Sequence, residues 1–344
     1  LVAQRFARTR FAPLALLRSA RLRMRLRDFV GARKDLTDLL DGYPDCHQSA
    51  SAYAVLGEVA MKSGRPAEAF RIFRKLYFLD LSSSSRASAA LGAGKCLYRQ
   101  GKYELASKWL NTFVRKAMRS RDENLPEACL LLARSCAGAG MDKEAVSAFE
   151  LALAAGIEEP QRTEARIELA RTHWKLGNHA RAITTLGDID PGARTPAQNY
   201  RVLLLTTQIY RDMGLPERAG RFLTSNLSSI VGREYQAQLV VELARCYRDS
   251  GQTQLAYHAL AGVFARLPAG ESSGLAACEL AQLCLATGKP AQAVTILQEV
   301  LGSSKASAYH SRARKLLVEA HLARQEYRSA MLAAPDKVTK GETR

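Results

Sequence analysis

Apolar and small residues recur along this chain with a long, nearly constant period. The stretch GRPAEAFRIF, which begins at Gly64, returns in similar form as GKPAQAVTIL at Gly288. Glycines mark the positions between them at steps of 37 residues, with a single step of 39: Gly64, Gly101, Gly140, Gly177, Gly214, Gly251 and Gly288. A fixed period of this length is the sequence signature of a repeat architecture.

Two further positions repeat in the same register. An alanine follows each glycine by five residues, and steps of 37 extend the series to both ends: Ala32, Ala69, Ala106, Ala145, Ala182, Ala219, Ala256, Ala293 and Ala330. Four residues beyond the alanine stands a large apolar side chain in eight of the nine units: Leu36, Phe73, Leu110, Phe149, Leu186, Leu223, Leu260 and Leu297. Seven residues before the glycine stands a small residue, with Thr207 as the bulkier exception.

This spacing predicts a helical hairpin in each unit. The first helix ends near the glycine, which tolerates the left-handed conformation, and a second helix begins two or three residues later. The small residues let the two helices approach closely, and the Leu or Phe fills the space between them. One hairpin cannot bury its own apolar face, so a stack of nine would bury a continuous core.

Composition supports helices and places charge at one end. Hydrophobic residues make up 47% of the chain but aromatic residues only 7%, which favours helix over strand. The formal net charge of +17 is concentrated in residues 1–121, which carry a net +15. Residues 1–27 hold eight arginines and no acidic residue. They are typical either of a transit-type or membrane-surface segment or of a basic helical pair with solvated arginines.

Membrane and redox signals point weakly to one compartment. No run of about 18 apolar residues is present, so we expect no membrane-spanning helix, and no intact signal peptide is visible. The seven cysteines are scattered without a CxxC pair, which argues against disulfides and zinc. These features favour a cytoplasmic or cytosol-facing location. A periplasmic location stays open if the sequence, which begins with Leu, is a fragment.

The repeat resembles the tetratricopeptide repeat (TPR). The family's large–small pair in the first helix is matched by Leu56–Gly57, Leu132–Ala133, Leu169–Ala170, Leu243–Ala244 and Leu280–Ala281, and its aromatic three positions on by Tyr210 and Tyr247. The resemblance covers about residues 13–334 and implies an all-α, right-handed superhelical solenoid of antiparallel helix pairs. Its nine units start near residues 13, 50, 87, 126, 163, 200, 237, 274 and 311. A basic segment (1–12) precedes the array and a polar tail (335–344) follows it.

Departures from the family pattern carry their own expectations. A period of 37 rather than 34 predicts links about three residues longer and a more open superhelix. The 39-residue step predicts an insertion at residues 117–125, as an exposed loop. Arg27 and Gln325 replace glycine in the first and last units, as in caps or a truncated array. Pentatricopeptide repeats are a related alternative, disfavoured because their RNA-reading positions are not visible here.

In TPR arrays the first helices line a concave groove, and the resemblance places a set of basic and aromatic side chains there. These candidate partner-binding residues are Arg21, Arg25, Lys62, Lys95, Tyr98, Arg99, Arg134, Arg171, Trp174, Lys175, Arg245 and Arg248. Arg pairs with carboxylates through two hydrogen bonds, and aromatic rings anchor apolar side chains. We therefore expect an acidic segment of a partner protein in the groove. The simpler alternative is that these charges only keep the groove soluble.

No residues suggest catalysis. The six histidines have no partner at metal-ligand spacing, and no phosphate-binding glycine pattern is present, so we expect a non-enzymatic scaffold without metal, cofactor or small-molecule substrate. Two alternatives stay open: nucleic-acid or anionic-lipid binding through residues 1–121, and a docking module of a bacterial envelope or polysaccharide-assembly protein. Self-association by end-stacking also stays open. On this basis, Arg134→Glu should weaken an acidic ligand and leave folding intact.

Overall fold

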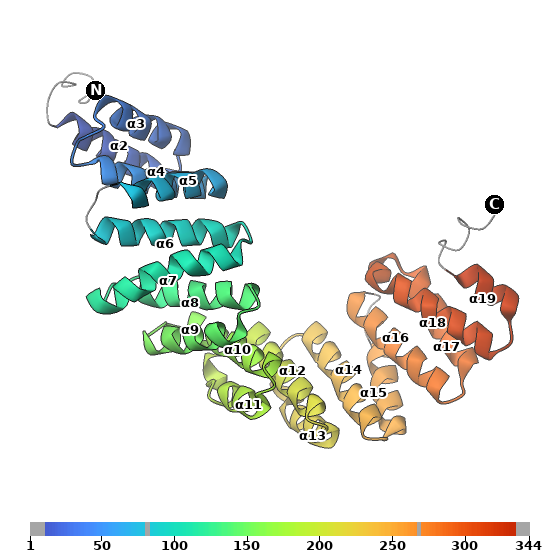
Figure 1. Cartoon of the computed structure of the whole chain (residues 1–344). Helices are drawn as coiled ribbons and strands as arrows, with labels where there is room; N and C mark the ends of the chain where they lie inside the picture. The colour runs from blue at the N-terminus through green and yellow to red at the C-terminus, as the bar shows by residue number, and fades with distance from the viewer. Residues whose placement is uncertain (1–10, 80–82, 267–269, 335–344) are drawn as a thin grey trace, which may run out of the picture. The chain divides into compact units, whose positions relative to one another are not determined.

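The computed structural model describes residues 11–79, 83–266 and 270–334, and within these ranges the regular structure is helical, without a strand (Figure 1). The all-α prediction is confirmed. The α-helices are α2 (Ala12–Arg25), α3 (Phe29–Gly42), α4 (Ser49–Lys62), α5 (Pro66–Phe78), α6 (Ser83–Arg99), α7 (Tyr103–Ser120), α8 (Leu125–Gly138), α9 (Asp142–Ala154), α10 (Gln161–Lys175), α11 (His179–Gly187), α12 (Pro196–Asp212), α13 (Pro216–Asn226), α14 (Arg233–Asp249), α15 (Thr253–Arg266), α16 (Glu271–Ala286), α17 (Pro290–Gly302), α18 (His310–Ala323) and α19 (Tyr327–Ala333). Short 3-10 helices precede α12, α14 and α18: η1 (Pro191–Ala193), η2 (Leu227–Ser229) and η3 (Ser304–Tyr309).

The chain divides into two compact units, Leu1–Asn178 and His179–Arg344. In the first unit, α2, α4, α6, α8 and α10 are first helices of their hairpins, and α3, α5, α7 and α9 are second helices. The second unit begins with α11 and continues through four hairpins from α12 to α19. The division falls inside the fifth predicted repeat, between its two helices, where the sequence period gives no sign of a boundary. The N-terminal residues 1–10 and the tail 335–344 lie outside the described residues.

The predicted hairpin turns are present in the predicted register. All seven periodic glycines have φ between +71° and +77°, the left-handed region that glycine enters without steric cost. The first helix ends two residues before the glycine in α4, and α5 begins two residues after it. Arg27 and Gln325 adopt the same conformation, with φ of +61° and +60°. The turn is therefore kept in the terminal units despite the loss of glycine.

The alanine register forms the seam of each hairpin. The nine periodic alanines are 0–4% exposed, and the eight Leu and Phe side chains that follow them are 0–5% exposed. The tightest contact is at Phe73, whose ring lies between the first helices of two successive units. A Cβ atom added to Gly57 on α4 or to Gly92 on α6 would lie 2.5 Å from this ring. Glycine is needed at both positions because any side chain would overlap the ring.

The predicted insertion loop is wrong in its conformation. Residues 117–120 continue α7, which is 18 residues long where α5 and α9 have 13. Ala117 is buried against the core of the first unit, so the apolar register of the helix extends into the inserted stretch. Only residues 121–124 form the link to α8, and Arg121 ends the helix in the left-handed conformation.

Within each unit the first helices lie closer to one another than the second helices do. Successive first helices pack together in the first unit (α2 with α4, α4 with α6, α6 with α8) and in the second (α12 with α14, α14 with α16, α16 with α18). In the described part of the chain, the backbones of successive second helices approach less closely, and α5 and α7 meet through long side chains such as Tyr77 and Trp109. We therefore call the surface made by the first helices the inner face of each unit, and the opposite surface the outer face.

A bulky residue at a buried periodic alanine should overpack its surroundings. Ala182 on α11 is 0% exposed, and we expect Ala182→Leu to lower the free energy of unfolding by about 1–3 kcal/mol. Ala180, two residues earlier and exposed, provides the matched control, because Ala180→Leu adds the same atoms to solvent. Urea unfolding followed by circular dichroism measures both. Equal stability of the two variants would show that the seam is misassigned.

Candidate partner-binding surface

The predicted basic positions fall on first helices, and several of them form ion pairs with the next first helix along the chain. On the inner face of the first unit, Lys95 Nζ on α6 lies 2.9 Å from Glu127 Oε1 on α8. Arg134 Nε on α8 lies 2.9 Å from Glu168 Oε2 on α10. The two contacts link three successive first helices, so these cations join neighbouring hairpins.

Arg134 stands at the centre of a small cluster. The half-buried Tyr98 ring contacts Tyr103 with centroids 5.6 Å apart, and its hydroxyl lies in the electrostatic field of Arg134 and Glu168. Burial alone would lower the pKa of Arg134, but the hydrogen bond and charge of Glu168 outweigh it and raise that pKa. Replacing Arg134 removes the ion-pair partner of Glu168, which destabilises a partly buried pair. The expectation that Arg134→Glu leaves folding intact was made without this pair.

Six predicted cations of the first unit have no carboxylate within ion-pairing distance among the described residues. They are Arg21, Arg25, Lys62, Arg99, Arg171 and Lys175, and all are exposed. Arg99 donates only to the Met61 carbonyl oxygen, at 3.4 Å. Trp174, next to Lys175 on α10, is half-buried. The inner face of the first unit therefore keeps an excess of positive charge that its own carboxylates do not neutralise.

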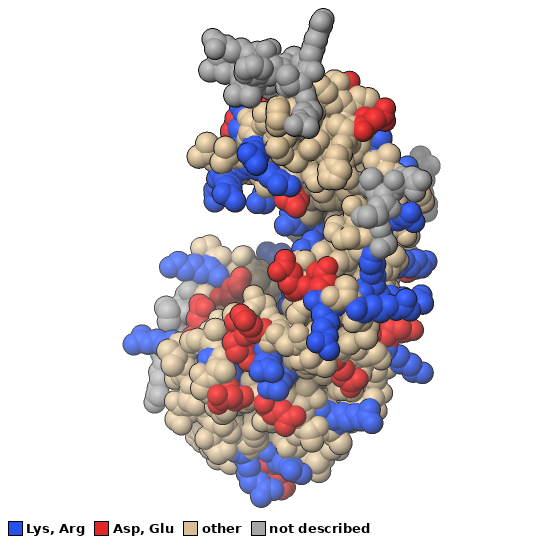
Figure 2. All heavy atoms as spheres, turned by 90° about the vertical axis from the view of Figure 1, so that its left-hand side faces the viewer, with Lys and Arg blue, Asp and Glu red and all other residues tan. Residues whose placement is uncertain are grey.

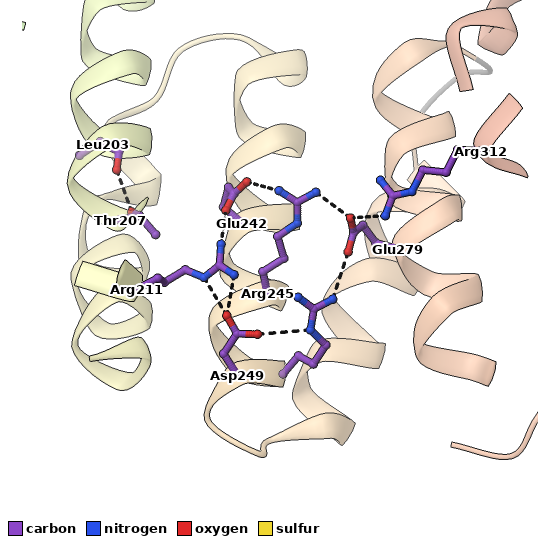
Figure 3. Close-up of polar contacts among 9 residues, drawn as sticks. Leu203, Thr207, Arg211, Glu242, Arg245, Asp249, Glu279 and Arg312 are labelled. Carbon is purple, nitrogen blue, oxygen red and sulfur yellow. Dashed lines mark hydrogen bonds and ion pairs between the residues drawn. The ribbon is translucent and has the colours of Figure 1, made fainter. Parts of the chain in front are cut away.

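The inner face of the second unit carries a continuous charge network instead (Figure 3). Arg211 on α12 lies 3.2 Å from Glu242 and 2.5 Å from Asp249, both on α14. Arg245 on α14 pairs with Glu242 on its own helix and lies 2.6 Å from Glu279 on α16. These contacts run from α12 through α14 to α16 and alternate in charge.

Glu279 is the hub of the network. Arg248 lies 3.3 Å from its Oε2 atom, and Arg312 on α18 lies 2.9 Å from its Oε1 atom, so guanidinium groups from two first helices surround one carboxylate (Figure 3). Glu279 is only 4% exposed. Burial alone would raise the pKa of its carboxyl, but the hydrogen bonds and charges of Arg245 and Arg312 outweigh it and hold that pKa below its ordinary value.

The carboxylates of these networks were missed in the sequence, although a signal for them exists. Glu168, Glu242 and Glu279 each open a Glu-Leu-Ala triplet, and they are separated by multiples of the 37-residue period. They stand three residues before the position of Arg171 and Arg245, which places them on the same helical face. The prediction counted the basic positions and did not count this acidic one.

Other candidate chemistry is structural. The described residues include no group of three or more His, Cys, Asp and Glu side chains that could hold a metal ion. Six of the seven cysteines are buried, and burial raises the pKa of the Cys96 thiol to about 12. The buried His321 lies 2.8 Å from Glu326, as expected of a packed structural histidine. No helix of the described ranges is long and apolar enough to cross a bilayer.

Hairpins with a shared seam and a charged inner face define the chain as an α-helical repeat protein. Sequence models of the tetratricopeptide repeat match residues 17–85, 55–120, 126–206 and 274–299, which together make up more than half of the chain. The chain therefore belongs to the tetratricopeptide repeat family, whose members are in general non-catalytic scaffolds for protein interactions. No curated protein sequence matches it.

Solved structures with a similar arrangement of helices are distant in sequence. A tetratricopeptide repeat protein from Parabacteroides merdae is 13% identical, with a TM-score of 0.48, 77% of this chain covered and 98% of that chain. PilF of Pseudomonas aeruginosa is 20% identical, with a TM-score of 0.45 and coverages of 62% and 90%. YrrB, described as a TPR protein with an unusual peptide-binding site, is 19% identical, with a TM-score of 0.44 and coverages of 54% and 87%. At these identities and scores the likenesses say nothing about what this chain binds.

Proposed function

We propose that the inner face of the first unit binds an acidic segment of a partner protein. The observation that carries this proposal is the contrast between the two units. The second unit neutralises its inner arginines with Glu242, Asp249 and Glu279, whereas six exposed cations of the first unit have no such partner among the described residues. Membership of a family of protein-interaction scaffolds supports a protein as the ligand.

The chemistry of this face suits carboxylates spaced along a chain. Arg21, Lys62 and Arg171 stand on α2, α4 and α10, so successive cations face a segment that runs across the helices. A guanidinium donates two parallel hydrogen bonds to a carboxylate, which fixes its orientation as well as its charge. Tyr98 and Trp174 are half-buried and provide apolar anchors between the charges. The ion pair of Arg134 with Glu168 links α8 to α10 on the same face.

Two charge-reversal variants test the proposal. The inner triple variant combines Arg21→Glu, Lys62→Glu and Arg171→Glu. The matched control, which we call the outer triple variant, combines Arg74→Glu, Arg115→Glu and Arg119→Glu on the second helices α5 and α7 and has the same net charge. All six residues are exposed, so circular dichroism should show both variants folded.

The probes are two fluorescein-labelled peptides of equal length, one in which Glu alternates with Leu and Ala and one in which Gln replaces each Glu. Fluorescence anisotropy should show binding of the Glu peptide alone, weakened at least about tenfold in the inner triple variant and unchanged in the outer one. An equal loss of peptide affinity in both variants would show that only the net charge of the protein matters. If the Gln peptide bound as tightly as the Glu peptide, the proposal that the partner is acidic would be wrong.

A further inference from the structure

The outer face of the first unit carries a second basic surface, distinct from the inner one. Arg71, Arg74 and Lys75 lie exposed on α5, and Arg115 and Arg119 lie exposed on α7. Side chains three, four or seven residues apart share one face of a helix. Each helix therefore presents one cationic stripe, and the buried seam alanines Ala69 and Ala106 mark the opposite side.

The two stripes are neighbours. Trp109 on α7 lies between Phe70 and Tyr77 of α5, with ring centroids 6.0 Å and 4.9 Å apart. The two helices hold the same place in successive hairpins and so run parallel, with the end of α5 level with Arg115 and the last turn of α7 extending beyond it. The cations gather there, because Arg74 and Lys75 lie near the end of α5, and Arg115 and Arg119 near the end of α7.

Few acidic side chains lie near this surface. Each helix has one acid, in its first turn, and each is already paired: Glu68 with Arg33 and Arg65, and Glu104 with Lys108. The flanking second helices bring the exposed acids Asp38 and Asp41 on α3 and Glu144 and Glu150 on α9, and Glu144 lines a hollow together with Arg115 and Met118. In Figure 2, basic side chains project along one edge of the face shown, with some acidic side chains among them. We call the C-terminal halves of α5 and α7 the outer basic patch.

A hollow of about 590 Å³ opens in the outer basic patch. The described residues that line it all belong to α7, and every one of them carries a hydrogen-bond donor: Asn111, Thr112, Arg115, Lys116, Arg119 and Ser120. These described side chains bring hydrogen-bond donors and three positive charges, which fit the oxygens of a phosphate group.

Exposed apolar side chains stand among these cations. Phe78, in the last position of α5, is 74% exposed, and Met118, between Lys116 and Arg119, is 51% exposed. Cations beside protruding apolar side chains fit the interface of a lipid bilayer, which takes charge at its headgroups and apolar groups below them. Nucleic acid fits less well, because the Tyr77 and Trp109 rings pack edge-on against each other and are not offered to bases.

We propose that the outer basic patch docks the first unit on a membrane surface that contains anionic phospholipids. The headgroup phosphates contact Arg115, Lys116 and Arg119, and Phe78 and Met118 enter the interface. The contact is peripheral, because no described helix is long and apolar enough to span a bilayer. Since the inner face points away from this surface, the proposal stands or falls independently of the acidic partner.

Vesicle flotation tests the proposal. The wild-type chain is mixed with vesicles of phosphatidylcholine alone or of phosphatidylcholine with phosphatidylglycerol, at low and high salt. Each Lys or Arg near an anionic surface changes binding several-fold, so the outer triple variant should bind the anionic vesicles about 100-fold more weakly. The inner triple variant, with the same net charge, should float like wild type. Phe78→Ser combined with Met118→Ser should weaken binding without any change of charge.

The results of these experiments support or overturn the lipid proposal as follows. Binding that needs phosphatidylglycerol and is lost in both the outer triple and the Phe78, Met118 variants confirms a lipid surface. Absence of wild-type flotation at low salt, or equal flotation of the inner and outer triple variants, overturns it. A fluorescein-labelled single-stranded RNA serves as the second probe. The lipid proposal is wrong, and the patch is a nucleic-acid surface, if three results coincide. The RNA binds the wild type, only the outer triple variant loses RNA binding, and the Phe78, Met118 variant still binds both RNA and vesicles.

Discussion

Replacing Glu279 with Ala should lower the free energy of unfolding of the second unit by about 3–5 kcal/mol, the usual cost of removing one partner from a buried ion pair. The carboxylate is 4% exposed and accepts from Arg245, Arg248 and Arg312. Without it, three guanidinium groups are left close together in a half-buried setting. Urea unfolding measures the loss, and Glu319→Ala, at an exposed position of α18, is the control.

The same carboxylate should give the second unit an acid limit. Its pKa is lowered in the folded state, so the stabilisation is complete above the ordinary glutamate pKa of about 4.3 and is lost as the pH falls through the lower folded value. Glu279→Gln should therefore have a lower free energy of unfolding than wild type at neutral pH. The difference between the two should become smaller as the pH falls. A stability difference that stays constant down to acid pH would show that the charge of Glu279 contributes nothing.

Replacing Phe73 with Ala should lower the free energy of unfolding of the first unit by about 3–5 kcal/mol. The ring fills the space between Gly57 and Gly92, and neither glycine has a side chain that could move into the vacated volume. Phe78→Ala on the same helix removes the same atoms from a side chain that is 74% exposed, and it should cost far less. Similar losses in the two variants would show that the ring is not wedged between the helices.

A double variant tests the steric cause. Gly57→Ala alone should destabilise, because its Cβ would lie 2.5 Å from the Phe73 ring. Other hairpins pair a small Ala with Leu, as Ala281 does with Leu297. Gly57→Ala combined with Phe73→Leu should therefore recover part of the stability lost in Gly57→Ala, whereas independent sites would give additive losses.

The hairpins could be predicted from the sequence because their geometry depends on local spacing. A glycine every 37 residues and an alanine five residues later are enough to place each turn and each seam, and the structure has both where expected. Even Arg27 and Gln325 keep the turn, since the packing of the helices on either side determines the backbone there. Local periodicity does not determine which hairpins form one compact unit, so the sequence could not predict the division after Asn178.

The candidate surface was only partly predictable. The period placed Arg134 and Arg245 on first helices, but each of them reaches a carboxylate 34 residues further on, Glu168 and Glu279. Whether such a pair forms depends on the stagger between two helices, which the spacing of residues in one helix does not determine. Arg99, in a neighbouring register position, is near no carboxylate among the described residues. The neutralised and unneutralised positions were therefore indistinguishable in the sequence.

The lengthened helix α7 has an evolutionary consequence. In a repeat array each hairpin contacts mainly its neighbours, so a change of length in one repeat need not disturb the others. Residues 116–120 extend α7 beyond the position where α5 ends, and they bring Lys116, Met118 and Arg119 to the outer face. The extended end of α7 can therefore vary in length and charge without disturbing the stacking of the other hairpins, so a surface property can change in one repeat alone.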